Sequence, residues 1–212
     1  VQGGELLPDL HGWPISPDFA LLLIATLQGQ AYDAVIEFGS GSSTLLIARV
    51  LRRLAGGAAT VPHLAFEHMR KYLHETRSLL ERAGFAEQVD LVHAPLQPFV
   101  ADDGAVYNYY DGLPALRALD ERLRATPSPR ILAVVDGPPA NSGPLARYPA
   151  LELILRVLQP TLGDLLLDDY ARDDEKEIVR RWQAWLAAHG YATRITEHAL
   201  EKGGCTLRFW RA

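Results

Sequence analysis

The chain has 212 residues, of which 48% are hydrophobic and 22% are charged. This composition is ordinary for a globular protein, and it excludes collagen, coiled-coil and low-complexity chains. The length favours one domain. The 21 Lys and Arg residues against 26 Asp and Glu residues give a formal net charge of -5. Neither nucleic acid nor an anionic membrane is therefore expected as a partner.

The single cysteine, Cys205, excludes an intrachain disulfide framework and a structural zinc site built from several thiolates. Its isolation favours a reducing, cytoplasmic compartment. The longest apolar run, residues 19–27, is too short to span a bilayer. It is expected to form a buried helix.

Short apolar runs alternate with amphipathic stretches, which is the order expected of strand, helix and strand units in a mostly parallel sheet. Strands are predicted at residues 34–38, 63–67, 89–92, 131–135 and 164–167. Helices are predicted at residues 43–54, 69–83, 145–157 and 173–189. The tail, with β-rich runs at 191–197 and 205–210, is expected to form a final antiparallel pair at the sheet edge. The predicted fold class is therefore α/β, with one doubly wound sheet.

Open α/β sheets bind ligands at the carboxyl ends of their strands, so the residues that follow each strand are informative. Glu37 ends the first strand and is followed by Gly-Ser-Gly-Ser-Ser-Thr at residues 39–44. The glycines permit a tight turn, and the hydroxyl side chains can cap the next helix, whose N-terminus suits a phosphate or a carboxylate. Thr44 stands where a dinucleotide fingerprint requires its third glycine, and no P-loop sequence occurs.

Acidic residues also end three of the other four predicted strands, the exception being the third, which is followed by His93. Glu67 is placed to accept hydrogen bonds from both hydroxyls of a ribose, and His68 beside it is either an adenine contact or a solvated loop histidine. Asp136 and the Asp168-Asp169 pair follow the fourth and fifth strands. Ordinary loop polarity is the alternative for any one of these acids. Together they predict a nucleoside-containing ligand without a pyrophosphate.

Residues 35–44 and Glu67 resemble the class I S-adenosylmethionine-dependent methyltransferases in their E-x-G-x-G form, and the resemblance covers nearly the whole chain. It implies a Rossmann-like, seven-stranded sheet with an antiparallel last strand, formed by a methyltransferase domain at residues 31–212. It also implies that residues 1–30 are a helical lead-in over the cofactor site. In this family the glycine loop holds the methionine end of S-adenosylmethionine, the acid holds the ribose, and the segment after the third strand packs the adenine. The implied cofactor-binding residues are Glu37, Gly39, Ser40, Gly41, Ser43, Thr44, Glu67, His68, Pro95, Leu96 and Asp136.

Residues 134–139 and 166–170 are similar to the corresponding segments of small-molecule O-methyltransferases. In the cation-dependent, catechol-type branch, an acid after the fourth strand and an acid followed by Asn after the fifth bind a divalent cation. Asp136 and Asp169 match these acids, whereas Tyr170 replaces the Asn and Pro139 replaces the lysine of that branch. Asp136, Asp168 and Asp169 are thus candidate ligands for Mg²⁺ or Mn²⁺, and metal dependence stays open. A looser similarity is to bacterial enzymes that methylate sugars.

Methyl transfer to a hydroxyl requires a general base, or a cation that lowers the pKa of the hydroxyl. Asp136 and Asp169 are the predicted catalytic residues. Because consecutive strand residues face opposite ways, only one of Asp168 and Asp169 is expected to face the site, and Asp169 is preferred. The alternative is that Asp136 only positions the cofactor and that Asp169 caps a helix.

Tyr110, Asp111 and Arg147 are candidate acceptor-binding residues, against the alternatives of ordinary packing for the first two and a surface position for the arginine. The predicted function is methylation of a hydroxyl on a small molecule or sugar. Aminopropyl transfer on the same fold and a non-catalytic nucleoside-binding module are the alternatives. The sequence leaves open whether the chain forms a homo-oligomer.

Overall fold

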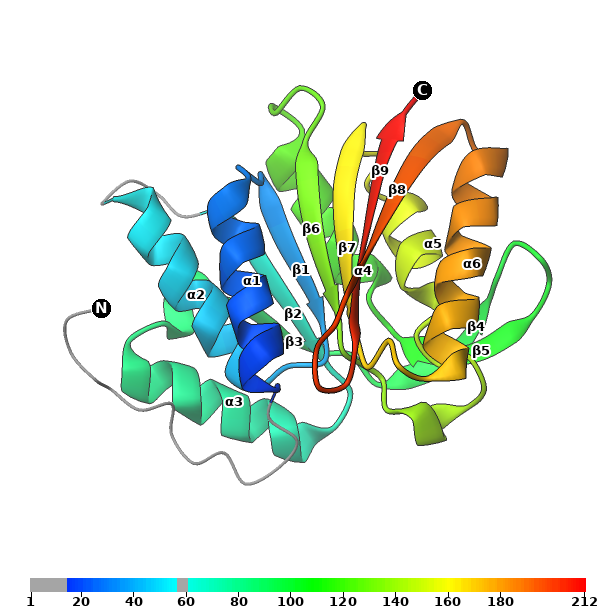
Figure 1. Ribbon diagram of the computed structural model, residues 1–212. Helices are drawn as coiled ribbons and strands as arrows, with labels where there is room; N and C mark the ends of the chain where they lie inside the picture. The colour runs from blue at the N-terminus through cyan, green and yellow to red at the C-terminus, as the bar shows by residue number, and fades with distance from the viewer. Residues whose placement is uncertain (1–14, 57–60) are drawn as a thin grey trace.

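The computed structural model describes residues 15–56 and 61–212 of the chain (Figure 1). The strands are β1 (Ala34–Phe38), β2 (His63–Glu67), β3 (Asp90–His93), β4 (Leu96–Val100), β5 (Val106–Tyr110), β6 (Arg130–Val135), β7 (Leu162–Asp168), β8 (Tyr191–His198) and β9 (Gly204–Arg211). The α-helices are α1 (Pro17–Gly29), α2 (Ser42–Ala55), α3 (Arg70–Ala83), α4 (Leu113–Leu123), α5 (Pro149–Leu155) and α6 (Asp173–Ala188). Two short 3₁₀ helices are η1 (Ala86–Gln88) and η2 (Ala140–Ser142).

Seven of the strands form one sheet in the order β3-β2-β1-β6-β7-β9-β8. The pairs from β3 to β7 are parallel, and β9 is antiparallel to both β7 and β8. The predicted α/β sheet with an antiparallel last strand is confirmed. From β1 the chain adds β2 and β3 on one side, and it then returns to add β6 and β7 on the other side of β1. The topological switch point therefore lies between β1 and β6.

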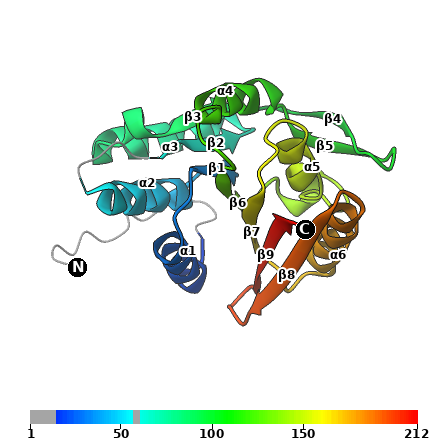
Figure 2. The same cartoon turned by 90° about the horizontal axis from the view of Figure 1, so that it is seen from above.

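Helices cover both faces of the sheet, as Figure 2 shows. On one face Phe19 of α1 and Ile47 of α2 pack with Val35 of β1, and α3 packs beside α2. On the other face Ile36 of β1 belongs to a core that includes Trp182 of α6 and side chains of α4 and α5. Adjacent residues of β1 thus enter opposite cores, which is why the strand is apolar apart from Glu37.

The predicted N-terminal lead-in lies partly outside the described residues. Within them, the Ser16 hydroxyl caps α1 by accepting the backbone N–H of Phe19 at 3.4 Å. Helix α1 packs against α2 and the sheet, and none of its residues lines the large pocket at the carboxyl end of β1. That residues 1–30 fold over the cofactor site stays a prediction. No helix in the described part of the chain is long and apolar enough to cross a bilayer.

The sequence did not predict the β4–β5 hairpin or α4, which connect β3 to β6. Pro98 lies inside β4, and the strand is mostly exposed, so no apolar run marks it. The predicted helix at residues 145–157 is shorter in the structure, because Leu145 has a left-handed φ of 50° and the helix begins only at Pro149. The chain between β6 and α5 is therefore an irregular loop.

Candidate functional site

A pocket of about 780 Å³ opens at the carboxyl ends of β1, β2, β6 and β7. This is the edge of the sheet at which the switch point lies, and ligands of open α/β sheets bind there. Its lining residues are Gly39, Ser40, Gly41, Ser42, Glu67, His68, Met69, Tyr72, Glu75, Thr76, Leu79, Tyr110, Asp136, Gly137, Pro139, Ala140, Asn141, Ser142, Arg147, Asp168, Asp169, Arg172 and Lys202.

The glycine loop after β1 lies against the turn after β6. Gly39 has a φ of +97°, and a Cβ there would lie 3.2 Å from the backbone nitrogen of Gly137. A Cβ on Gly137 would lie only 2.2 Å from the hydroxyl oxygen of Tyr110. Both positions therefore require glycine, one for its backbone conformation and both for the close approach.

Three of the predicted cofactor residues are buried and do not line the pocket. The hydroxyl of Thr44 donates to Oε2 of Glu37 at 2.7 Å, and the backbone N–H of Gly41 donates to Oγ1 of Thr44 at 2.9 Å. Glu37, Ser43 and Thr44 are buried. Their observed contacts hold the shape of the glycine loop from below.

Glu67 stands at the end of β2 and faces the pocket. Its Oε1 accepts the backbone N–H of Met69 at 2.8 Å, and its Oε2 accepts the hydroxyl of Ser40 at 3.3 Å. Nδ1 of His68 lies 3.2 Å from the same Oε1. These contacts fix the carboxylate, and each oxygen retains acceptor capacity for a ligand hydroxyl.

Tyr110 offers a donor to the pocket. Its ring packs against Phe38 and Phe66, and its buried hydroxyl has no hydrogen-bond partner among the described residues. Burial, reinforced by the nearby carboxylates of Glu67 and Asp136, raises the pKa of this hydroxyl well above its usual value. It stays protonated at neutral pH. An unpaired buried hydroxyl is costly, so a ligand that accepts this hydrogen bond fits the site.

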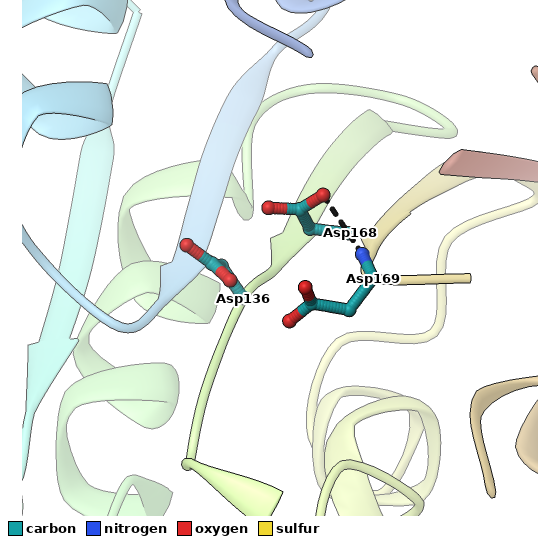
Figure 3. Close-up of side chains that lie close together, drawn as sticks. All are labelled: Asp136, Asp168 and Asp169. Carbon is teal, nitrogen blue, oxygen red and sulfur yellow. Dashed lines mark hydrogen bonds between the residues drawn. The ribbon is translucent and has the colours of Figure 1, made fainter. Parts of the chain in front are cut away.

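Three carboxylates converge at the ends of β6 and β7 (Figure 3). Asp136 follows β6, Asp168 ends β7, and Asp169 comes next in the chain. One ligand oxygen from each lies within 4.8 Å of the others. Asp169 has a left-handed φ of 59°, which breaks the strand alternation, and its N–H donates to Oδ1 of Asp168 at 2.8 Å. The prediction that only one of these two faces the site is therefore wrong, because both line the pocket.

The carboxyl group of Asp136 has a strongly raised pKa. Burial raises its pKa to about 7, Arg147 opposes the rise, and the negative charges of Asp168 and Asp169 add to it. Burial also raises the pKa of Asp168. A carboxyl with a pKa near neutrality can accept a proton during a reaction, as a general base must.

Arg147 is 3% exposed, so the surface alternative for this residue is wrong. Its guanidinium lies among the acids, with Nη2 2.8 Å from Oδ2 of Asp169 and 3.3 Å from Oδ1 of Asp136. Of the other acceptor candidates, Tyr110 lines the pocket, whereas Asp111 does not.

The predicted adenine segment lies elsewhere. Pro95 and Leu96 do not line the pocket, because Leu96 already begins the hairpin strand β4. The wall at that side is formed by α3, through residues that include Tyr72 and Thr76. The sequence marked α3 only as an amphipathic helix, and nothing in its pattern distinguishes the residues that line a pocket from those that pack on a neighbour.

No protein-family model and no curated protein matches the chain. Solved structures do match. The O-methyltransferase from Bacillus cereus in complex with SAH has a TM-score of 0.60 at 18% identity, over 93% of this chain and 83% of that one. The O-methyltransferase TomG from Streptomyces achromogenes, involved in tomaymycin synthesis and solved with SAM, has a TM-score of 0.62 at 18% identity, over 96% and 84%.

A candidate rRNA methylase from Clostridium thermocellum also matches, with a TM-score of 0.56 at 13% identity, over 94% of this chain and all of that one. Sequence identities this low establish similarity of fold alone. They do not identify the methyl acceptor, because enzymes of one fold act on many different acceptors. The sheet order, the helical layers and these matches agree. The chain has the Rossmann-like fold of S-adenosylmethionine-dependent methyltransferases.

Proposed function

We propose that the pocket binds S-adenosylmethionine and that the protein methylates a hydroxyl group on a small molecule or sugar. The observation that carries the proposal is that Gly39, Glu67 and Asp136 line one and the same pocket. Glu67 would accept the two ribose hydroxyls, and the glycine loop would admit the methionine end without a side chain in the way. The unpaired hydroxyl of Tyr110 would donate to the same ligand.

When bound, S-adenosylmethionine would supply the methyl group of its sulfonium to an acceptor oxygen, and S-adenosylhomocysteine would leave as the thioether. The task of the chain is then to align the acceptor and to remove its proton. Asp136 is the base that we assign to this step, because its carboxyl faces the pocket with a pKa of about 7. Its Oδ2 has no protein hydrogen bond among the described contacts, so it can receive the hydroxyl proton.

The experiment is an acceptor screen with a methyl donor labelled in the methyl group, using panels of sugars and of phenolic compounds. Transfer of label by the native chain, lost in Asp136→Asn with donor affinity retained, would support the proposal. Preference for the decarboxylated donor, with transfer of its aminopropyl group, would favour the aminopropyl alternative. Donor binding without transfer to any acceptor would favour a binding module.

A further inference from the structure

The most densely bonded side chain of the pocket is Arg147. It lies in the loop between η2 and α5, and its two terminal nitrogens face inward. Nη2 donates to the backbone carbonyl of Asp136 at 3.0 Å and to Oδ2 of Asp169 at 2.8 Å. Nη1 donates to the backbone carbonyl of Asp168 at 2.9 Å and lies 3.7 Å from Oε1 of Glu175. One guanidinium thus joins the ends of β6 and β7 and the first turn of α6.

A divalent cation held by the three aspartates would lie beside this guanidinium. Mg²⁺ requires an octahedron of oxygens at about 2.0–2.1 Å. An ion shared by Oδ1 of Asp136 and Oδ2 of Asp169 would stand where Nη2 of Arg147 now lies between them. A guanidinium keeps its charge throughout the accessible pH range, so it repels such an ion at any working pH.

The acid preferred as a metal ligand is also the one most fully neutralised. Asp169 receives a second guanidinium from Arg172, whose Nη1 lies 2.9 Å from Oδ2. Glu175 lies between the two arginines, 3.5 Å from Arg172. One oxygen of Asp168 is taken by a backbone N–H. The donor set therefore does not fit a resident Mg²⁺ or Mn²⁺ site, in contrast to the expectation from the aspartates alone.

We propose that Arg147 is the built-in cation of this site, which takes the place of a divalent metal by bridging Asp136 and Asp169. It acts as a positioning residue, because both of its terminal nitrogens are engaged by oxygen atoms of the protein. Held in this way, Asp136 has one oxygen fixed by the arginine and the other directed to the pocket. The catalytic part of this inference rests on the proposed function, whereas the exclusion of metal does not.

The first test measures metal binding to the full chain without cofactor or acceptor. Mn²⁺ is titrated into the protein and the free ion is followed by electron paramagnetic resonance. The native chain is expected to bind no Mn²⁺ at micromolar concentrations. Arg147→Met keeps the apolar stem but removes the charge, and it is expected to gain a Mn²⁺ site that Asp136→Asn in the same background abolishes. Micromolar binding by the native chain, lost in Asp136→Asn, would overturn the proposal.

Two further variants keep the test decisive. Arg172→Met removes the exposed guanidinium from Asp169 and leaves Arg147 in place, so it should gain no Mn²⁺ site. Arg147→Lys retains the positive charge, so it should bind no Mn²⁺ either. This variant serves as the test if Arg147→Met does not fold. Micromolar Mn²⁺ binding by a folded Arg147→Lys variant, or by Arg172→Met, would contradict the assignment of Arg147 as the excluding charge.

The second test uses activity. Methyl transfer by the native chain is expected to change less than twofold after exhaustive dialysis against EDTA, and Arg147→Met is expected to lower kcat more than it changes KM. Activity lost with EDTA and restored by Mg²⁺ would refute the inference and leave the proposed function standing. Absence of methyl transfer altogether would refute the proposed function, while the Mn²⁺ titration would still decide whether Arg147 excludes metal.

Discussion

Replacing Glu67 by Gln should weaken the binding of S-adenosylmethionine with little effect on the fold. The amide oxygen of Gln can still accept the N–H of Met69, which Oε1 now accepts at 2.8 Å. The Ser40 hydroxyl, which now donates to Oε2 at 3.3 Å, can turn and accept from the new amide. The substitution therefore removes mainly the negative charge that the ribose hydroxyls would meet.

A hydrogen bond to a charged group contributes about 1.5–3 kcal/mol. Since about 1.4 kcal/mol corresponds to a factor of ten, Glu67→Gln should raise the dissociation constant about 10- to 100-fold. Isothermal titration calorimetry measures this constant directly. Glu87→Gln, at an exposed carboxylate outside the pocket, is the matched control and should leave it unchanged. Equal affinity in the native chain and in a folded Glu67→Gln variant would refute the assignment of the ribose to this carboxylate.

Three other outcomes follow from the structure. Because burial raises the pKa of Asp136 to about 7 and only its ionised form accepts a proton, kcat should rise as the pH increases through 7; a rate independent of pH between 6 and 8 would argue against this base. Gly137→Ala places a Cβ 2.2 Å from the Tyr110 hydroxyl and should cost about 1–3 kcal/mol of stability, partly recovered with Tyr110→Phe; a single variant as stable as the native chain in urea would contradict this packing. Asp164 is fully buried outside the pocket, where it pairs with Arg130 and Arg208, so Asp164→Ala should cost about 3–5 kcal/mol of stability in urea; a loss below about 1 kcal/mol would show that these ion pairs are not needed.

The inner strands β1, β2, β6 and β7 could be predicted because burial on both faces leaves largely apolar runs in the sequence. The termini of β1 and β2 match the predicted residues, and those of the other sheet strands lie within two residues of them. The hairpin could not be predicted in this way. Its β4 strand is largely exposed and contains Pro98, so its pairing with β5 leaves no periodic signal.

The candidate site could be predicted where a residue ends a strand or directly follows one, as Gly39, Glu67 and Asp136 do. Arg147 could not, because its burial depends on the convergence of β6, β7 and α6 on an irregular loop. The position of Asp169 was predicted from strand alternation, which a left-handed residue does not obey. Sequence periodicity thus locates the ends of strands, and the pairing of charges beyond them depends on the tertiary structure.

A crystal structure of the protein with S-adenosylhomocysteine tests the central claim most directly. The account predicts one molecule per chain, with its ribose hydroxyls on Glu67, its amino acid end at Gly39 and its sulfur facing Asp136 across the pocket. A molecule bound elsewhere, or a pocket that stays empty at saturating ligand while the protein is folded, would contradict it.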